Sequence, residues 1–339
     1  MFLEEIDDVT DGSSTAVPVK DKDGRSLLAV ILKYTFQVDA RGRVELIDDA
    51  PPPPLVDEYH GSDPASCSIR RPAQLFDYKP GTDVILVGHA HPPAGKAVKH
   101  VDVVMTVGPI TKTVRAHGLR AWQQALRGGL TPGPARPMRE PVPLLYELAW
   151  GGHDFSDPAH LISEPRNLLG RGVARNPRAL VGEPAAQLEY PDNPIGHGDN
   201  IPACFGAIHR HWEPRARYAG TYDQAWQDDK MPLLPDDFDP RFHVAVPPNQ
   251  WSPTPLRGDE PFEIQGATPE GLWRFQLPRI SPGFSSFVGS KRAEHRTHLD
   301  CIFIDADAGR VELYWRAAIL LPRKYQMLEA VTIFEKDRI

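Results

Sequence analysis

Residues 193–239 read NPIGHGDNIPACFGAIHRHWEPRARYAGTYDQAWQDDKMPLLPDDFD. Neither the 3.6-residue period of a helix nor the two-residue alternation of a strand continues across this stretch. It is too rich in Trp, Tyr and Phe to be a flexible linker, and too irregular to form regular elements. The stretch therefore predicts a long irregular connection, called the central segment below, that particular contacts hold in place.

Proline is concentrated around the central segment. The chain has 36 prolines in 339 residues, and 21 of them fall between Thr131 and Pro261. Because proline fixes φ and has no backbone N–H, this part cannot be mainly helix or central strand. We expect one domain over residues 1–339, with an N-terminal β region (20–130), a Pro-rich irregular segment (131–261) and a C-terminal β region (262–339).

Alternating apolar and polar runs flank the Pro-rich segment on both sides. These runs, broken by Gly, Asp and Pro turns, predict strands and antiparallel hairpins. The predicted hairpins cover residues 27–49, 98–117, 262–277 and 299–320, with a further strand at Val84–His89 and a short helix or strand at Met327–Phe334. The expected fold class is mainly β, with antiparallel sheets in a sandwich or barrel-like arrangement and few short helices.

Three further local predictions follow from the sequence. Helical patterns are confined to Arg120–Arg127 and Tyr222–Asp229. Gly283–Lys291, GFSSFVGSK, resembles a phosphate-binding loop, but its spacing is one residue too long, and Arg292 stands where that loop needs Ser or Thr. We therefore expect an exposed flexible connection there. The strands of the 98–117 hairpin are expected to offer exposed edges to which a partner strand could be added.

Charge and cysteine content restrict the class of protein. A formal charge of −7 leaves no basic footprint, so nucleic acid is not an expected partner, whereas a protein with a basic surface is allowed. Three cysteines, Cys67, Cys204 and Cys301, do not form a disulfide framework and suit the cytoplasm. The acidic start MFLEEIDDVTDG has no signal-peptide pattern, and the longest apolar run, Leu27–Leu32, is too short for a membrane span.

Seven short motifs occur in order between residues 20 and 320. They are GTDVILVG at Gly81–Gly88, GLRAW at Gly118–Trp122, PLLYELAWGG at Pro143–Gly152, NPIGHG at Asn193–Gly198, FGAIHRHWEPR at Phe205–Arg215, GTYDQAW at Gly220–Trp226 and PLLPDDFD at Pro232–Asp239. The set resembles the bacterial family DUF2169, a domain of unknown function. The chain departs from the family pattern at Leu119, where an acidic residue is usual, and at Trp150, where a Phe is usual.

The resemblance implies a role in type VI secretion. Proteins of this family look like accessory factors, encoded beside spike and toxin genes, that load an effector onto the secretion spike. The implied partners are a secreted effector (toxin), the spike protein or both, and the resemblance implies no enzyme activity and no cofactor. The motifs mark as candidate interaction positions Asn193, Gly196, Trp212, Arg215, Tyr222, Asp223, Trp226, Asp237 and Asp239.

Catalytic signatures are sparse. The chain has no G-x-S-x-G, H-E-x-x-H or C-x-x-C motif. One alternative is a hydrolase that uses the Asp236–His243 region, although Asp beside Pro is more typical of turns and helix caps, and the spacing does not fit a calcium loop. The His89/His91 and His209/His211 pairs have the i, i+2 spacing of metal ligands on a strand, but no carboxylate or Cys stands at ligand spacing beside them.

Aromatic residues in the Pro-rich segment allow two interpretations. Exposed on loops, they would suit a carbohydrate-binding module or a protein partner. Buried, they would hold the irregular chain on the sheets, and we expect this for Trp212, Tyr222 and Trp226. Arg215 is expected to bond loop carbonyls or an Asp through its guanidinium.

Overall fold

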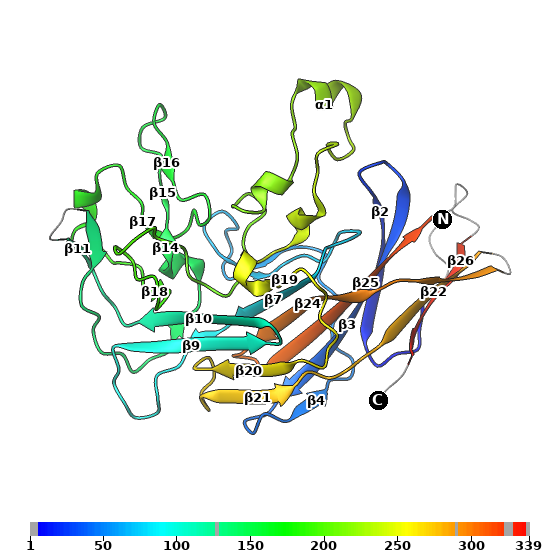
Figure 1. The fold of residues 1–339 in the computed structure, drawn as a ribbon, viewed down its shortest axis with the longest axis horizontal. Coiled ribbons are helices and arrows are strands. Elements are labelled where there is room, and N and C mark those ends of the chain that lie inside the picture. Colours follow the sequence, from blue (N-terminus) through cyan, green and yellow to red (C-terminus); the bar gives the residue numbers. More distant parts are fainter. Residues whose placement is uncertain (1–5, 126–128, 289–290, 322–327, 337–339) are drawn as a thin grey trace.

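The computed structural model describes residues 6–125, 129–288, 291–321 and 328–336. These residues form a mainly β structure with several mostly antiparallel sheets (Figure 1), so the predicted fold class is confirmed. The sheets do not close into a barrel within these residues. The helices described are α1 (Gln224–Asp229) and the 3-10 turns η1 (Tyr146–Leu148), η2 (Pro177–Leu180), η3 (Ala216–Tyr218), η4 (Pro240–His243) and η5 (Pro248–Gln250).

A seven-stranded sheet is the framework of the molecule. Its order is β19 (Trp251–Ser252), β7 (Thr82–Val87), β24 (His298–Asp305), β25 (Arg310–Leu320), β3 (Ser26–Val38) and β2 (Ser13–Lys20), with β4 (Val44–Leu46) beside the end of β3. All neighbours are antiparallel except β7 and β24. The predicted hairpins at 27–49 and 299–320 are confirmed, and they join each other through β3 and β25.

A five-stranded sheet covers one face of this framework. Its order is β18 (Leu188–Glu189), β10 (Ile110–His117), β9 (His100–Val107), β20 (Pro261–Gln265) and β21 (Leu272–Gln276). The predicted hairpins at 98–117 and 262–277 are therefore confirmed. The expectation of free edges in the 98–117 hairpin is wrong for β9, which β20 covers at residues 104–107, and for Arg115 and Ala116 of β10, which pair with β18. Among the described residues, no strand pairs with the outer edge of β10 over residues 110–114.

The third large sheet has four strands, in the order β1 (Ile6–Asp8), β26 (Leu328–Glu335), β22 (Pro282–Val288) and β23 (Lys291–His295). The prediction of an exposed loop over 283–291 is wrong for residues 283–288, because β22 pairs with β26 and buries Phe284 and Ser285. Residues 289 and 290 lie outside the described residues. Gly283, Ser285 and Ser286, which suggested a loop, lie in β22, where a Cβ on Gly283 would come within 2.5 Å of the Phe334 ring. The last predicted element is a strand; of it, Met327 lies outside the described residues.

Five two-stranded pairs complete the fold. They are β5 (Glu58–Tyr59) with β6 (Ile69–Arg71), β8 (His89–Ala90) with β13 (Val142–Pro143), β11 (Trp122–Gln124) with β12 (Leu130–Pro132), β14 (Trp150–Gly151) with β17 (Arg171–Gly172), and β15 (His153–Asp154) with β16 (Ile162–Ser163). The predicted helix at 120–127 is wrong where it is described, since Trp122 lies in a strand and is buried edge-on against Trp150. Residues 126–128 lie outside the described residues. Tertiary burial of a large aromatic overrides a weak helical pattern.

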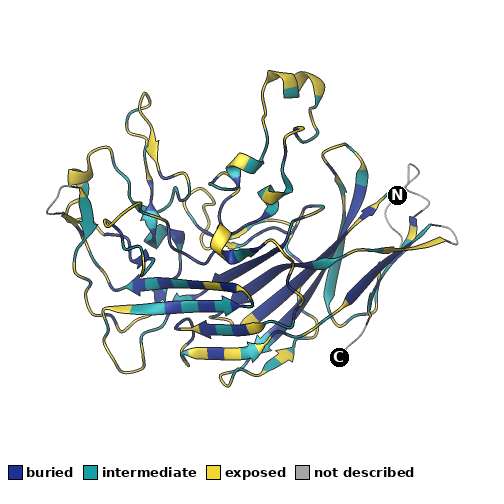
Figure 2. Cartoon of the chain, in the orientation of Figure 1, coloured by how far each residue is buried: buried dark blue, intermediate teal, exposed yellow. Residues whose placement is uncertain are grey.

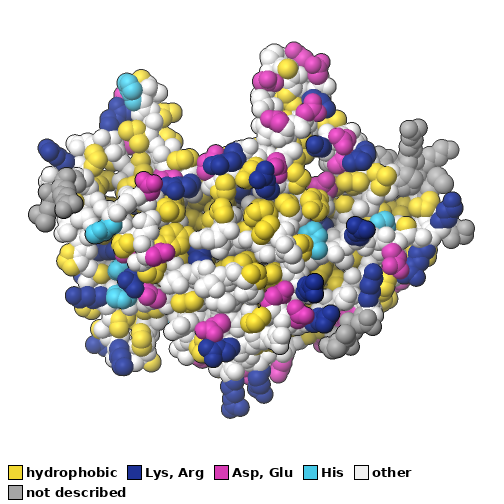
Figure 3. Space-filling view, viewed as in Figure 1, with side chains coloured by type: hydrophobic (Ala, Val, Ile, Leu, Met, Phe, Trp, Pro, Cys, Tyr) yellow, Lys and Arg dark blue, Asp and Glu magenta, His cyan; other side chains and the backbone are white. Residues whose placement is uncertain are grey.

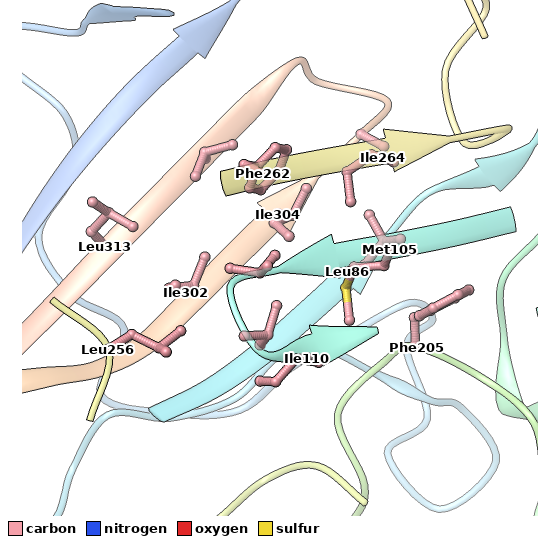
Figure 4. Close-up of a cluster of buried hydrophobic side chains, with 14 of the residues drawn as sticks. Leu86, Met105, Ile110, Phe205, Leu256, Phe262, Ile264, Ile302, Ile304 and Leu313 are labelled. Atoms are coloured by element: carbon pink, nitrogen blue, oxygen red, sulfur yellow. The ribbon is translucent and has the colours of Figure 1, made fainter. Parts of the chain in front are cut away.

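The main core lies between the seven-stranded and five-stranded sheets. Leu86, Ile302 and Ile304 of the first sheet meet Met105 and Phe262 of the second (Figure 4). Alternate residues of β3 enter this core and the others point to the opposite face, so both faces of that strand are buried. Figure 2 shows that the central strands of the sheets are mostly buried, whereas the projecting segments are exposed.

No large sheet covers the opposite face of the seven-stranded sheet in the described residues. Ile31, Ile85 and Phe303 on this face pack instead against Ile69, in the short strand β6, and against Val246, which lies in irregular chain. Irregular chain from the N-terminal and Pro-rich parts thus takes the place of a sandwich layer.

A buried carboxylate joins β18 to β10. His117 Nε2 lies 2.7 Å from Glu189 Oε1, and Arg120 donates to Glu189 Oε2 at 2.9 Å. Burial alone would raise the pKa of Glu189, but the hydrogen bond from His117 and the ion pair with Arg120 outweigh it and hold that pKa at about 2.

We expect Glu189→Gln to lower the free energy of unfolding at pH 7 by about 3 kcal/mol, since one pKa unit corresponds to about 1.4 kcal/mol. The folded pKa lies below its ordinary value of 4.5, so this stabilisation is present above pH 4.5 and is lost as the pH falls toward 2. Urea unfolding at several pH values should show the difference between wild type and variant shrinking below pH 4.5. Glu213→Gln removes a pair with the exposed Arg217 and should change stability by less than about 1 kcal/mol; an equal loss in both variants would contradict the assignment.

Candidate functional site

Buried side chains hold the irregular chain by donating to its carbonyl groups. Arg215 is 5% exposed, and it donates from Nε to the carbonyl of Phe242 (2.9 Å) and from Nη1 to that of Ile208 (2.8 Å). Burial lowers the pKa of Arg215 to about 10, so the guanidinium stays charged at neutral pH. The predicted bonding of Arg215 to loop carbonyls is confirmed. It fixes residues 208, 215 and 242 relative to one another.

Gln250 and Lys112 also donate hydrogen bonds to carbonyl groups of the irregular chain. Gln250 donates from Nε2 to the carbonyls of Val84 and Phe205, both at 2.8 Å, and so joins β7 to the central segment. Lys112 reaches from β10 to the carbonyl of Cys204 at 2.6 Å. A loop without ladder hydrogen bonds must find partners for its backbone groups, and these buried donors supply them.

A buried ion pair attaches the Pro-rich segment to the seven-stranded sheet. Lys79 Nζ lies 2.9 Å from Asp83 Oδ2, and the same oxygen accepts from the backbone N–H of Ala245 at 2.8 Å. Arg316, on β25, pairs with Asp300 at 2.8 Å. These two ion pairs therefore lie under the irregular layer.

Trp212 is the aromatic anchor of the central segment. It is 1% exposed, and its ring packs edge-on against Tyr146 with centroids 5.4 Å apart. His209 lies 4.3 Å from the Trp212 ring, and its Nε2 is 3.1 Å from the carbonyl oxygen of Cys67. Burial lowers the pKa of His209 to about 4, so this histidine is neutral at pH 7. The predicted burial of Trp212 is confirmed.

Residues 219–237 leave the body of the molecule as a projection, called the α1 arm below (Figure 1). Its base is closed by Asp237, which accepts from the backbone N–H of Thr221 at 2.9 Å and from its hydroxyl at 2.8 Å. Gly220 has φ +85°, and a Cβ there would lie 2.9 Å from the Asp237 carboxylate. The narrow neck of the arm therefore requires glycine at this position.

The tip of the α1 arm contains helix α1. Asp223 caps the helix by accepting from the N–H of Trp226 at 2.9 Å. Trp226 Nε1 donates to the carbonyl of Leu233, and Tyr222 packs edge-on against the same indole at 4.7 Å. The predicted helix is confirmed, but the predicted burial of Tyr222 and Trp226 on the sheets is wrong. Tyr222 is 49% exposed and Trp226 half-buried, because these rings stabilise the arm itself.

Acidic residues at the end of the arm and directly after it hold turns or pair with basic side chains. Asp239 caps η4 by accepting from the N–H of Arg241, and its carboxylate also pairs with that guanidinium at 2.6 Å. Asp236 pairs with Lys230 at 2.5 Å. His243 stacks on Phe76 at 4.7 Å, and burial lowers its pKa to about 3. These groups, the centre of the alternative hydrolase interpretation, are thus engaged in structural contacts.

The NPIGHG motif forms a separate turn. Asn193 Nδ2 donates to the carbonyl of Asp199 at 2.9 Å, and Gly196 N–H donates to Asn200 Oδ1 at 2.9 Å. Gly196 has φ +90° and faces the backbone of Leu130, which explains the glycine. The two candidate positions in this motif therefore shape a loop some distance along the chain from the arm.

A second projection was not predicted from the sequence. The β15–β16 hairpin, residues 153–163, stands beside the α1 arm with a hollow between them (Figures 1 and 3). It exposes Phe155, Leu161 and Ile162. The available signal was FSDPAHLI, in which apolar residues flank a turn-forming Ser-Asp-Pro.

Two grooves lie along the loop of residues 55–66. One, of about 450 Å³, is lined by Leu55, Val56, Asp57, Tyr59, Leu75 and Arg210. The other, of about 540 Å³, lies at the base of the β15–β16 hairpin and is lined mainly by residues 152–184, with Ala65 and Ser66 on its near side. The polar contact in the first groove is the Arg210–Asp57 pair at 3.5 Å. These grooves offer apolar surface with few charges.

The histidine pairs do not assemble a metal site within the described part of the chain. His89 Nδ1 lies 2.7 Å from Asp307 Oδ2, and His91 Nε2 lies 4.0 Å from Asp307 Oδ1. Across the described residues, three or more His, Cys, Asp or Glu do not come together in a way that could hold a metal ion. In the same residues, every helix is too short or too polar to cross a membrane.

A comparison with protein-family models identifies the same family as the sequence motifs. A family model described as "Uncharacterized protein conserved in bacteria (DUF2169)" matches residues 23–316. The chain belongs to DUF2169. The match includes the whole central segment, the α1 arm and the β15–β16 hairpin, so these features lie inside the DUF2169 region. No curated protein and no solved structure matches the chain.

Burial predicts that Trp212 and Trp226 differ in their effect on stability. Trp212→Ala should lower the free energy of unfolding by about 3–5 kcal/mol, the usual range for a buried large aromatic. Trp226→Ala should cost less than about 1.5 kcal/mol, because it loosens only the arm. Denaturant unfolding measures both, and hydrogen exchange should show faster exchange confined to residues 221–237 in Trp226→Ala. Equal losses in the two variants would place Trp226 in the core.

Proposed function

We propose that this member of DUF2169 is a non-enzymatic type VI secretion adaptor. It binds a cognate effector in the cytoplasm as a chaperone and helps to load that effector onto the secretion spike. This is the role that the family resemblance implies. The observation that supports it here is a body with two projections that expose apolar or aromatic side chains, Tyr222 and Met231 on the α1 arm and Phe155, Leu161 and Ile162 on the β15–β16 hairpin.

The α1 arm has the chemistry of a protein-binding element. Residues 222–237 include five Asp and one Lys, and acidic side chains gather on the projection that carries α1 (Figure 3). Tyr222 and Met231 are exposed among them, Met231 at 65%. An exposed aromatic and an exposed Met beside charges are typical of recognition surfaces. The matching surface on the effector is apolar at its centre and basic around it.

The framework favours binding with little rearrangement. The base of the arm is fixed by Asp237, and the arm rests on the β2–β3 turn, where a Cβ on Gly24 would lie 3.0 Å from Leu233. Positions fixed before binding lose less conformational entropy when the partner arrives. An adaptor that must select one effector benefits from such a fixed surface.

The alternatives have less support from the same residues. A hydrolase needs carboxylates free to accept a proton, whereas Asp237 and Asp239 bond to Thr221 and Arg241. A carbohydrate-binding module needs a flat platform of exposed rings, whereas Trp212 is buried and Tyr222 packs edge-on against Trp226.

Deleting the gene should stop export of the effector encoded beside it while the spike and tube still assemble. Immunoblots of culture supernatant for that effector and for the spike and tube proteins measure this. Co-purification should give a stable one-to-one or two-to-two complex that survives moderate salt. Unchanged export of the effector would refute the adaptor role, and loss of all type VI export would indicate a core component.

Within that complex, Tyr222→Ala with Met231→Asp should weaken binding at least about tenfold, which corresponds to about 1.4 kcal/mol. Leu272→Asp, at an exposed position on β21, is the matched control and should bind normally. Isothermal titration with the purified effector gives the affinities. Equal affinity of both variants would remove the arm from the interface.

The purified chain should hydrolyse no common ester, peptide, glycoside or phosphate substrate above the uncatalysed rate. The reason is that the carboxylates and the histidine of the 236–243 region are committed to turns and packing. Turnover that disappears in Asp237→Ala or His243→Ala, with the circular dichroism spectrum unchanged, would establish the hydrolase instead.

A further inference from the structure

A cavity lies where the three large sheets meet. The chain passes it on the way from β21 of the five-stranded sheet to β22 of the four-stranded sheet (Figure 1). Its lining also includes Leu299 of β24 and Trp315 of β25, from the seven-stranded sheet. The volume of about 370 Å³ is within the size range of small-molecule sites. The α1 arm and the β15–β16 hairpin contribute no residue to this cavity.

Backbone contacts hold the walls of the cavity in place. Leu256 N–H donates to Thr82 Oγ1 at 2.9 Å, which attaches the loop before β20 to β7. Gly258 has φ +88°, and a Cβ there would lie 3.0 Å from the carbonyl oxygen of Pro278. The loop that carries Leu256 therefore packs closely against the loop after β21. Walls that are fixed in this way lose little conformational entropy when a ligand binds.

Two arginines line the cavity, and acidic side chains do not balance their charge within it. The Arg257 guanidinium has no ion pair or hydrogen bond to any residue that the structure describes, and Arg279 lies 3.8 Å from Asp259, a long and exposed pair. The other nearby carboxylate, Glu260, accepts from the backbone N–H groups of Arg257 and Gly258 at 2.7 and 2.9 Å. None of the residues given for the lining is acidic. The cavity therefore has an excess of positive charge.

A buried hydroxyl without a partner belongs to the same lining. Thr297 Oγ1 is buried and has no hydrogen-bond partner in the described part of the chain. An unpaired buried polar group costs free energy, so its presence requires an explanation, and a bound ligand is one. His298 also lines the cavity, but its Nε2 lies 3.0 Å from the carbonyl oxygen of Lys79 and is already engaged.

We propose that this cavity binds a phosphate group. Arg257, Arg279 and Thr297 come from three different segments of the lining, so their donors approach an anion from more than one side. The three terminal oxygens of a phosphate monoester accept from such a set of donors, and a guanidinium meets two of those oxygens with two N–H groups. A carboxylate has two oxygens in one plane and would leave part of the set unused.

The apolar part of the lining fits the organic group of a phosphate monoester. Leu256, Leu299 and Trp315 line the cavity together with the polar groups. An organic group attached to the phosphate would remove apolar surface from water there. A free phosphate ion would use the polar groups alone. The two sources share the phosphate chemistry and differ in how much the apolar walls contribute to affinity.

The inference goes beyond the proposed function and does not depend on it. A ligand that binds only the folded chain stabilises it, here at the junction of three sheets. Loss of phosphate binding with effector binding intact, or the converse, would show that the two proposals stand or fall separately.

Phosphorus NMR of the full chain with inorganic phosphate, at constant ionic strength, tests the site directly. The phosphate signal should broaden in a saturable way, and Arg257→Gln with Arg279→Gln should weaken binding at least about tenfold. The matched control is Arg217→Gln with Arg274→Gln. It removes the same two charges from exposed ion pairs outside the cavity, and it should bind phosphate as wild type does. Broadening that does not saturate, or a double variant of the cavity that binds as tightly as wild type, would overturn the proposal.

Thr297→Val tests the hydroxyl separately and does not depend on the arginine variants. Without phosphate, its midpoint of thermal unfolding should equal or exceed that of wild type, because a buried hydroxyl without a partner is replaced by a methyl group. Its affinity for phosphate should fall at least about fivefold, because a hydrogen bond to a charged group is lost. A lower midpoint with unchanged affinity would make the hydroxyl structural and contradict the site.

Phenyl phosphate and benzoate complete the experiment. Tighter binding of phenyl phosphate than of inorganic phosphate would assign the site to a phosphate monoester, and the reverse order would assign it to the free ion; both support a phosphate site. Benzoate that binds as tightly as phenyl phosphate would overturn the choice of phosphate over carboxylate.

Discussion

Hydrogen bonds from buried side chains to loop carbonyls are the interaction on which the rest of this structure depends. The seven-stranded sheet has one face covered by a second sheet and the other covered by irregular chain. Chain without ladder bonds cannot be buried unless its N–H and C=O groups find partners. Arg215, Gln250 and Lys112 provide those partners, and each reaches its carbonyl from a fully or almost fully buried position.

The same need for partners explains the positions of the buried charged residues beneath the irregular chain. Asp83 receives both Lys79 and the Ala245 N–H, so one buried carboxylate joins a strand, a loop and a second loop. Removing a single member would leave a buried charge without its partner, which costs far more than losing a surface pair. The result is a stiff body from which the α1 arm and the β15–β16 hairpin project (Figure 1).

The amino-acid pattern was sufficient for much of the strand framework and for one helix. The 98–117 and 299–320 hairpins follow from two-residue alternation around Gly and Asp turns, which is local information. It was insufficient for Trp122, whose helical context is overridden by burial against Trp150. It was also insufficient for residues 283–288, whose Gly and Ser suggested a loop but lie in β22. Edge availability was also misjudged, because the partners of β9 and β10 come from residues distant in the chain.

What the sequence by itself determined was the class of the fold, the family, and the irregularity of residues 193–239, since composition, alternation and proline content are local properties. It also singled out Trp212 and Arg215, whose residue types fit burial and carbonyl binding. Only the tertiary structure decided that Tyr222 and Trp226 build an exposed arm while Trp212 is buried. The three aromatic side chains lie in similar local sequence, so their difference in burial depends on which part of the chain packs on the sheet. Long-range contacts decide this, such as the hydrogen bond from Arg215 to the carbonyl of Phe242, which joins residues that no local pattern relates.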